Sequence, residues 1–199
     1  HKLVCYTVKS VNAPEKASFI LHKKPASILK NILAKVTDEI AVTFDSRNAI
    51  FTLGNTVLVC RLIEGTYPAY RTVIPKNNPN KMIIGRIELL NAVRRVAVCS
   101  NQATSHIVLK LDTNELMITA EDTEFSISAY EKINCQYDGA SMSIGFKAPF
   151  LAEILGNFPY ENICMELADS CRAALIVSAD EKDPTEDLCA LLMPIMINS

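Results

Sequence analysis

The order of apolar and polar residues along the chain predicts the same pair of elements three times. A short apolar segment, which we expect to be a strand, precedes a stretch with apolar residues at helical spacing. The three expected strands cover residues 18–21, 82–84 and 142–144. The first helical stripe consists of Ile28, Leu29, Ile32, Leu33 and Val36, and the second of Leu89, Leu90, Val93 and Ala97. One apolar stripe on an otherwise polar segment is typical of a helix that packs on a core.

Three segments of alternating apolar and polar residues follow each expected helix. They cover residues 40–44, 49–53 and 57–62, then 106–111, 116–120 and 125–130, and finally 163–167, 173–177 and 188–193. Alternation with a period of two, interrupted by short polar turns, indicates antiparallel hairpins with one buried face. The sequence therefore predicts an α+β fold of three β-α-β-β-β repeats, each about sixty residues long.

The repeats also predict how the chain divides into domains. A single repeat would leave one helix and a sheet with an exposed edge, whereas two repeats can share a sheet edge and pack their helices together. We expect residues 81–199 to form one complete domain from two repeats, and residues 1–74 to be the second half of another domain. Residues 75–80 contain two prolines and three asparagines, which predicts an exposed linker. The start at His1 favours a fragment or a processed product.

Charge is unevenly distributed, although the whole chain is nearly neutral. Its 20 basic and 22 acidic side chains give a formal charge of −2, which excludes a globally basic nucleic-acid binder. The segment from Lys23 to Lys35 nevertheless has four lysines and no acid, and Arg86 to Arg95 has three arginines and one acid. Such helices could face phosphates without reading sequence. The alternative is that these side chains form the solvated faces of amphipathic helices.

Chemistry-bearing side chains are scattered. The seven cysteines lie in or beside apolar segments without a Cys-x-x-Cys pair, which is typical of reduced core thiols, and the three histidines have no ligand-like spacing. We expect no metal and no cofactor. Phosphate-binding loops, nucleophile elbows and zinc-protease motifs are absent from the sequence, which argues against an enzyme. The sequence shows neither a secretory signal nor an apolar run long enough to span a bilayer.

Two motifs add to the repeat. The segment 64–71 reads EGTYPAYR and is followed by Ile74-Pro75-Lys76, and the segment 191–195 reads LLMPI. With the threefold repeat, they resemble the bacterial sliding clamp family, the β subunit of DNA polymerase III. The resemblance covers essentially the whole chain. It implies the DNA clamp fold, with sheets outside and helices on the inner face, and assigns residues 1–74 to the middle domain and 81–199 to the C-terminal domain.

The resemblance also implies a function without catalysis. Members join head to tail as homodimeric rings around duplex DNA, independently of its sequence, and confer processivity in the bacterial cytoplasm. We expect the full-length protein to form such a ring, and these 199 residues alone not to form one. The partners would be the replicative polymerase subunit, the clamp loader and repair polymerases, held through hydrophobic linear peptides. The residues expected to face DNA are Lys23, Lys24, Lys30, Lys35, Arg86, Arg94 and Arg95.

The family motifs place two further sites on this chain. The pocket for partner peptides would consist of His1, Lys2, Leu3, Pro68, Val73, Leu191, Met193, Pro194 and Ile195. The subunit interface would consist of Val98, Cys99, Phe125 and Ile127, and Arg95 could serve there instead of at DNA. This chain has Thr72 where family members often have arginine, at the polar rim of the pocket. From the residues alone, the alternative that Leu191 and Met193 are ordinary sheet core is favoured over a pocket.

Two other functions stay open at this point. A non-replicative scaffold could share the repeat without binding replication proteins. An enzyme domain that uses one of the scattered cysteines is the second alternative. Binding of a Gln-Leu-x-Leu-Phe peptide, and its loss in Met193→Ala, would favour the clamp over the scaffold, and loss of a turnover after thiol alkylation would favour the enzyme.

Overall fold

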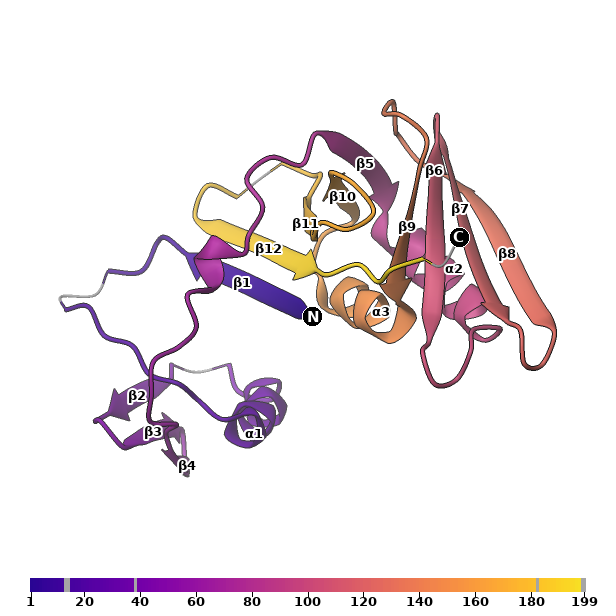
Figure 1. The fold of residues 1–199 in the computed structure, drawn as a ribbon. Coiled ribbons are helices and arrows are strands. Elements are labelled where there is room, and N and C mark those ends of the chain that lie inside the picture. Colours follow the sequence, from indigo (N-terminus) through magenta and orange to yellow (C-terminus); the bar gives the residue numbers. More distant parts are fainter. Residues whose placement is uncertain (13–14, 38, 182, 198–199) are drawn as a thin grey trace. The chain divides into compact units, whose positions relative to one another are not determined.

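A computed structural model describes residues 1–12, 15–37, 39–181 and 183–197 of the chain (Figure 1). The described residues form three helices and antiparallel sheets, so the predicted α+β class is confirmed. The chain separates into two compact units. The larger unit contains His1–Val11 and Tyr70–Ser199, and the smaller unit contains Asn12–Ala69.

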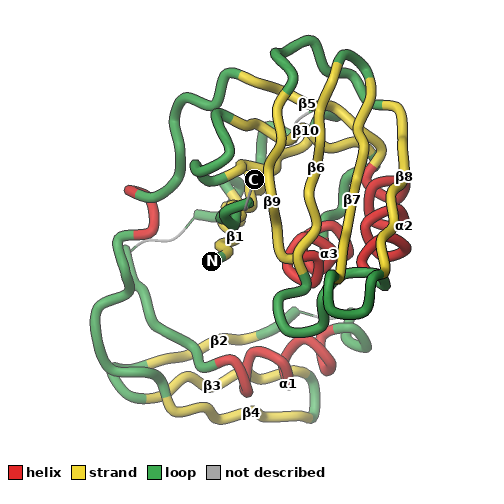
Figure 2. Tube along the Cα trace, turned by 45° about the vertical axis from the view of Figure 1, so that its right-hand side comes forward, coloured by secondary structure: helices red, strands yellow, loops and turns green. Residues whose placement is uncertain are grey.

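The larger unit has two antiparallel sheets. The five-stranded sheet has the order β1 (Lys2–Val8), β12 (Glu186–Leu192), β11 (Ala174–Ser178), β10 (Asn162–Leu167) and β5 (Asn80–Gly85). The four-stranded sheet has the order β8 (Ile127–Asn134), β7 (Glu115–Asp122), β6 (His106–Asp112) and β9 (Met142–Lys147). Helices α2 (Arg86–Ala97) and α3 (Ala148–Asn157) pack against each other (Figure 2).

The two repeats of the larger unit exchange their first strands. Strand β5 runs into α2 but pairs with β10 of the following repeat. Strand β9 runs into α3 but pairs with β6 of the preceding repeat. Each sheet therefore contains one strand from the other repeat, which removes an exposed edge from each. This exchange is why two repeats form one domain.

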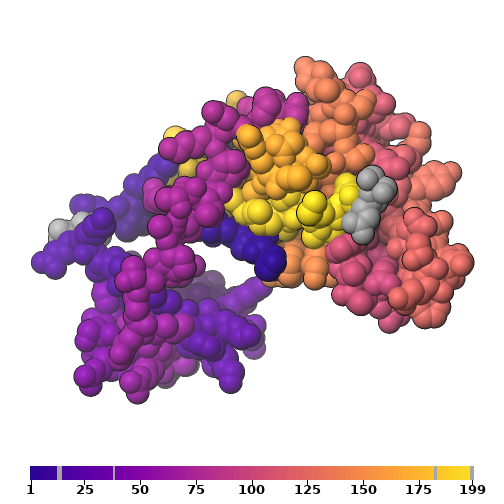
Figure 3. All heavy atoms as spheres, viewed as in Figure 1, coloured from indigo at the N-terminus to yellow at the C-terminus, as the bar shows by residue number. Residues whose placement is uncertain are grey.

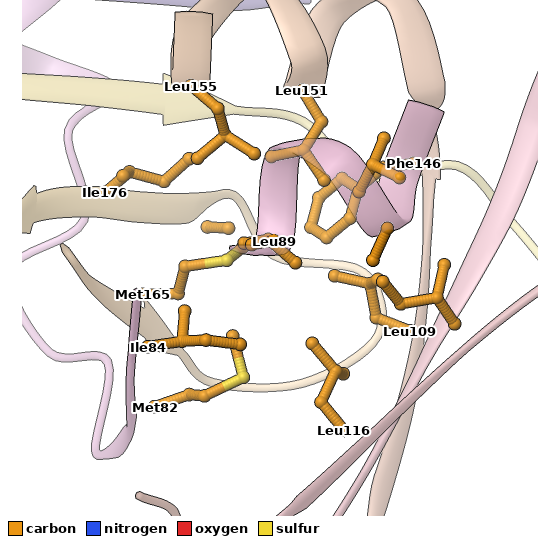
Figure 4. Packing of buried hydrophobic residues seen from close by; sticks show 14 of the residues in the cluster. Met82, Ile84, Leu89, Leu109, Leu116, Phe146, Leu151, Leu155, Met165 and Ile176 are labelled. Atoms are coloured by element: carbon orange, nitrogen blue, oxygen red, sulfur yellow. The ribbon is translucent and has the colours of Figure 1, made fainter. Parts of the chain in front are cut away.

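A single hydrophobic core joins both sheets of the larger unit to both helices. Its described residues include thirty buried hydrophobic side chains, and Phe146, Met82 and Leu89 are among the largest that are completely buried. Figure 4 shows Leu151 and Leu155 of α3 pointing toward this core from one side and Met165 and Ile84 of the sheet from the other. The helical stripe predicted around Leu89 and Val93 lies in the core.

The smaller unit contains one repeat. Helix α1 (Lys23–Leu33) precedes an antiparallel sheet of β2 (Ala41–Phe44), β3 (Asn48–Leu53) and β4 (Thr56–Arg61). The His22 side chain accepts a hydrogen bond from the Lys24 amide and caps the start of the helix. The core of the smaller unit is small. The buried hydrophobic residues among those described are Leu29, Ala49, Phe51, Leu53, Cys60 and Leu62.

The strand predicted at residues 18–21 does not form, so this prediction is wrong. Ile20 keeps one backbone hydrogen bond, its carbonyl oxygen accepting from the Ile63 amide at 3.0 Å. The strand exchange of the larger unit supplies the reason, because a first strand pairs with the sheet of a second repeat. The smaller unit has a single repeat, so this segment finds no such sheet within it, and all four residues of β2 are exposed.

The compact units do not coincide with the expected domain boundaries. Strand β1 was expected with residues 1–74, but it pairs with β12 over its whole length and belongs to the larger unit. The expected linker at 75–80 contains the buried Asn78. Its side-chain amide nitrogen donates to the carbonyl oxygens of Glu166 and Ala173 at 2.9 and 3.0 Å. Both contacts attach the segment before β5 to the larger unit.

Candidate functional site

The five-stranded sheet of the larger unit has two faces with different surroundings. Ala190 and Leu192 of β12 lie in the main core, as do Ala174 and Ile176 of β11. Leu191 is only 3% exposed but lies outside that core cluster. Because successive side chains of a strand point to opposite faces, Leu191 lies on the face turned away from the core. We call this the outer face.

Four residues expected in the peptide pocket meet on the outer face. Leu3 lies opposite Leu191 in the antiparallel register of β1 and β12. The same register continues beyond the strands, since the Met193 amide donates to the His1 carbonyl oxygen at 2.9 Å. The side chain of Met193 is 43% exposed beside the buried Leu191. The result is an apolar surface with a flexible methionine at its rim, a composition that suits adaptable binding.

The Lys2 side chain lies on the face of the sheet opposite to that of Leu3 and Leu191. It pairs with Leu192, and its ammonium group forms an ion pair with Glu153 of α3. The same ammonium group lies 5.0 Å from the centre of the Phe150 ring. The structure therefore directs the Lys2 side chain to α3, while its neighbour Leu3 faces outward.

The terminal segment connects the two sheets of the larger unit. After Met193 and Pro194, the Ile195 amide donates to the Gly145 carbonyl oxygen at 2.9 Å, and the two residues form an isolated β-bridge. Figures 1 and 3 show the yellow end of the chain crossing from β12 over the surface of the larger unit. A Cβ at Gly145 would lie 3.0 Å from the Ile195 carbonyl oxygen, so this close crossing favours glycine.

The remaining pocket residues come from the segment around η1 (Tyr70–Thr72). Val73 is exposed, and its amide donates to the Tyr70 carbonyl oxygen at 3.2 Å. The Arg71 guanidinium interacts with Tyr70 and, more weakly, with Cys5 of β1, and these groups raise the pKa of Arg71. Pro68 is exposed and belongs to the smaller unit. Thr72 is exposed on η1.

The four lysines expected to face DNA lie on or just after α1. Lys23, Lys24 and Lys30 are exposed helix residues, and Lys35 is exposed two residues after its end. Within the described part of the chain, these lysines form no ion pair. Their charge therefore remains available to anions in solution.

The three arginines of α2 differ in their contacts. Arg86 donates from Nη1 to the Leu155 carbonyl oxygen at 2.9 Å and from Nε to the Tyr160 carbonyl oxygen at 2.7 Å. Leu155 lies in the last turn of α3 and Tyr160 in the segment that follows it, so this guanidinium caps the helix end. Arg86 is thereby bound within the protein.

Arg95 is also paired within the protein, whereas Arg94 lines a groove. The Arg95 guanidinium binds both carboxylate oxygens of Glu131 in β8, at 3.0 and 2.5 Å, and this bond lowers the pKa of Glu131. The groove, of about 220 Å³, lies between α2 and α3. Its lining consists of Val93, Arg94, Ala97, Ser100, Ser105, Ala148, Pro149 and Ala152. Sequence reasoning did not find it, because α2 and α3 are about fifty residues apart in the chain.

The expected subunit-interface residues lie at one end of the four-stranded sheet. Val98, just after α2, is 80% exposed and Phe125, in the β7–β8 turn, is 68% exposed. Ile127 begins β8, which is an edge strand of its sheet, and Cys99 is half-buried. Exposed apolar side chains beside an unpaired strand edge are typical of an association surface.

A buried carboxylate fixes the two loops that carry these residues. Asp122 is 2% exposed and accepts hydrogen bonds from the Glu124 and Phe125 amides at 3.0 and 3.4 Å. Its other oxygen accepts from the Asn101 side chain at 3.3 Å. Asn101 in turn accepts from the amides of Ala103 and Thr104, and so organises the loop after α2. Sequence reasoning placed neither Asp122 nor Asn101 near the expected interface residues.

The remaining candidates for metal ligands and reactive thiols are the His, Cys, Asp and Glu side chains of the described residues. Among the described residues, no group of three or more His, Cys, Asp or Glu side chains could hold a metal ion. Cys60, Cys135 and Cys164 are buried, as expected, but Cys171 is exposed in the β10–β11 turn, so the expectation of a buried thiol is wrong there. No described helix has the length and apolar composition needed to cross a membrane.

Comparison with known proteins finds relatives over most of this chain. The "Beta sliding clamp" of Haemophilus influenzae is 29% identical over 182 residues, which is 91% of this chain and 49% of that protein. The "Beta sliding clamp" of Escherichia coli K12 is 30% identical over 180 residues, or 90% of this chain and 49% of that protein. The chain therefore spans about half the length of the curated relatives it matches.

The fold comparison gives the same result. A crystal structure of the sliding clamp from Pseudomonas aeruginosa bound to griselimycin superposes with a TM-score of 0.90 at 26% identity. The match covers 99% of this chain and 52% of that one. The model of the C-terminal domain of the DNA polymerase III beta subunit matches residues 71–195, more than half of the chain. The chain therefore belongs to the DNA polymerase III beta subunit family, the beta sliding clamps, and contains its C-terminal domain.

Proposed function

We propose that residues 1–199 are part of a bacterial sliding clamp that has no catalytic activity of its own. In the longer protein, two subunits join head to tail around duplex DNA in the bacterial cytoplasm and hold replication proteins on it. Family membership and the clamp fold support this proposal over a thiol-dependent enzyme. The smaller unit would belong to the second half of the middle domain, because it contains one helix and the three-stranded sheet that follows it, without a second repeat.

The outer face of the five-stranded sheet carries the proposal. Here β1 and β12 place Leu3 beside Leu191, with the partly exposed Met193 at the rim. An apolar surface of this kind can bind short hydrophobic segments of many different proteins, because apolar contacts adapt and methionine repacks. The polymerase subunit, the clamp loader and repair polymerases would share it. Within the larger unit, Val73, Pro194 and Ile195 would complete the pocket, and His1 would flank it.

The contact with DNA would be electrostatic and weak. Lys23, Lys24, Lys30 and Lys35 are exposed, as is Arg94, and exposed cations attract phosphates without reading sequence. Arg86 and Arg95 are weaker candidates, since their guanidinium groups already bind carbonyl or carboxylate oxygens of the protein. A ring provides the residence time on DNA, so a few exposed cations suffice and sliding stays fast.

The subunit interface would use the edge of the four-stranded sheet. Val98, Phe125 and Ile127 are exposed there, with Cys99 half-buried beside them. The buried Asp122 and its hydrogen bond to Asn101 hold these loops in place before the partner arrives. Preorganised loops lower the entropy that association has to overcome.

The experiment is a titration of the 199-residue chain with a labelled peptide containing Gln-Leu-x-Leu-Phe, followed by fluorescence anisotropy. We expect saturable binding, weakened about tenfold or more in Met193→Ala, because truncation removes apolar contact area from the pocket. Met196→Ala is the matched control, since Met196 lies three residues on and is 83% exposed. The longer protein with the same substitutions provides the second measurement. Equal binding by both variants in both contexts would favour a scaffold without a clamp pocket.

A further inference from the structure

Two cysteines face each other across the edge of the five-stranded sheet. Cys5 of β1 lies directly opposite Cys189 of β12 in the antiparallel register. The Met193 amide donates to His1 and the Lys9 amide to Thr185, so residues 1, 9 and every second residue between them occupy hydrogen-bonded positions. Cys5 is one of these. At such positions the two Cα atoms are about 5.5 Å apart, which lies within the range of about 4.4–6.8 Å that disulfides span.

Both thiols lie on the outer face. Cys189 precedes Leu191 by two residues and Cys5 follows Leu3 by two, so the cysteine pair forms the row next to Leu3 and Leu191. Both cysteines are half-buried, whereas Cys60, Cys135 and Cys164 are buried. The pKa of the Cys189 thiol is raised, chiefly by burial and next by the charge of Cys5. The register therefore places the two thiols next to each other on one face of the sheet.

We propose that Cys5 and Cys189 are a reversible disulfide site that reacts with low-molecular-weight disulfides of the glutathione type and fastens β1 to β12. The Cys5 thiolate attacks one sulfur of the oxidised reagent, forms a mixed disulfide and releases one reduced thiol, which takes up the proton. The Cys189 thiolate then attacks the Cys5 sulfur and releases the second thiol. The two cysteines lose two electrons, and one reagent disulfide becomes two thiols.

The order of attack follows from the surroundings. Cys5 lies on the edge strand β1, where an incoming reagent can reach it from outside the sheet. Burial disfavours the Cys189 thiolate, so Cys189 is better suited to resolve the mixed disulfide than to start the reaction. Cβ atoms at hydrogen-bonded positions are about 5.5 Å apart, against about 3.8 Å in disulfides. The strands therefore draw together when the bond forms, which makes it easy to reduce.

The bond would act on the edge of the sheet. Strand β1 is a terminal strand of this sheet and β12 is its sheet neighbour. A covalent link between them would restrain local opening of β1, and with it the position of His1 and Leu3 beside Leu191 and Met193. The inference concerns a covalent site and does not rest on the proposed function, so peptide binding is not needed to test it.

The experiment equilibrates the 199-residue chain with graded ratios of oxidised to reduced glutathione, stops exchange with acid, alkylates free thiols and analyses peptides by mass spectrometry. We expect a Cys5–Cys189 linked peptide at least tenfold more abundant than any other cysteine pair, and its loss on adding dithiothreitol. Cys5→Ser and Cys189→Ser should abolish it. Cys171→Ser, which removes an exposed cysteine in a turn, should leave it unchanged.

Hydrogen exchange on the unsubstituted protein provides the second measurement. The amides of Leu3 and Thr7 point toward β12, because they share the hydrogen-bonded register with Cys5. We expect them to exchange at least tenfold more slowly in the oxidised protein. If Cys5 and Cys189 were both found alkylated, with no linked peptide at any glutathione ratio, the proposed disulfide site would be rejected. If the Cys5–Cys189 peptide formed but the Leu3 and Thr7 amides exchanged at an unchanged rate, the disulfide would not fasten β1 to β12.

Discussion

The Arg86 guanidinium, at the start of α2, donates a 2.9 Å hydrogen bond to the carbonyl oxygen of Leu155, in the last turn of α3. The last four carbonyl groups of a helix have no partner within it. Arg86 satisfies one of them and also binds the Tyr160 carbonyl oxygen. A basic residue of the helix proposed to face DNA thus has a structural role between two repeats.

Replacing Arg86 should therefore lower stability. We expect Arg86→Ala to reduce the free energy of unfolding by about 1–3 kcal/mol, because it leaves two carbonyl groups without their donor. Urea unfolding followed by circular dichroism measures the change. Arg94→Ala is the control, since Arg94 is exposed, and it should change stability by less than about 0.5 kcal/mol. Equal stabilities of both variants would show that the Arg86 contacts contribute nothing.

His106 should make stability depend on pH. Burial, and then the charge of Lys147 directly opposite in β9, lower its pKa in the folded protein. The unfolded chain therefore binds a proton at a higher pH than the folded one. The contribution of neutral His106 to the free energy of unfolding is present above the unfolded pKa of 6.5. It is lost as the pH falls toward the lower pKa of the folded protein.

The measurement compares unfolding free energies at pH 7.5 and pH 5. Wild type should lose more stability than His106→Gln over this interval, since the variant lacks the titrating group. Lys147→Gln should lose an intermediate amount, because burial still lowers the pKa of His106 when the lysine charge is absent. If wild type and His106→Gln showed the same pH dependence, the direction of this pKa shift would be wrong.

Much of the fold follows from local patterns, whereas the strand exchange does not. Helical stripes and period-two alternation predict α1, α2, α3 and the hairpins, because each depends on neighbours in the chain. The pairing of β5 with β10 joins residues about eighty positions apart, and nothing in either segment marks the exchange. The strand expected at 18–21 fails for this reason, since its partner would be a sheet of another repeat.

The candidate site shows the same limit. The family resemblance places Leu3 and Leu191 in one pocket, and the register puts them directly opposite each other on neighbouring strands. The ion pair of Lys2 with Glu153 joins strand and helix across 151 positions, and the pair of Arg95 with Glu131 joins helix and strand across 36. Sequence spacing contains no signal for such contacts, so it cannot tell a bound cation from a free one.

Asp122 should matter for the loops that carry Val98 and Phe125. Asp122→Ala removes the acceptor for two amides and for the Asn101 side chain, so we expect a loss of about 1–3 kcal/mol in unfolding free energy. The Phe125 amide should also exchange faster with deuterium. Asp112→Ala is the matched control in the exposed β6–β7 turn, and its effect should be smaller. Equal losses in both variants would argue against a special role of the buried carboxylate.

The smaller unit should open before the larger one. Its described core has six buried hydrophobic residues, against thirty in the larger unit, and all residues of β2 are exposed. Opening free energies follow the apolar area that a region buries. Hydrogen exchange on the intact chain should therefore show much lower protection in β2, β3 and β4 than in β6 and β7. Comparable protection in the two sheets would mean that the units unfold together.

The crossing of the terminal segment over Gly145 can be tested with a single methyl group. A Cβ at this position would lie 3.0 Å from both the Ile195 carbonyl oxygen and its Cγ1. Backbone cannot yield as a flexible side chain does, so we expect Gly145→Ala to cost about 1–3 kcal/mol and to break the bridge to Ile195. Faster exchange of the Ile195 amide reports the second effect.

Gly156→Ala, also in the larger unit, should change the free energy of unfolding in the opposite direction. The nearest atom to a Cβ there is Nη2 of Arg94, at 4.0 Å, and the residue is helical. Alanine should therefore stabilise α3 by about 0.5–1 kcal/mol, since glycine is the poorer helix former. Opposite signs for the two substitutions would show that the loss at Gly145 comes from the close approach of the terminal segment. If Gly145→Ala left both stability and the Ile195 amide unchanged, the segment that carries Met193 and Pro194 would not be held by this bridge.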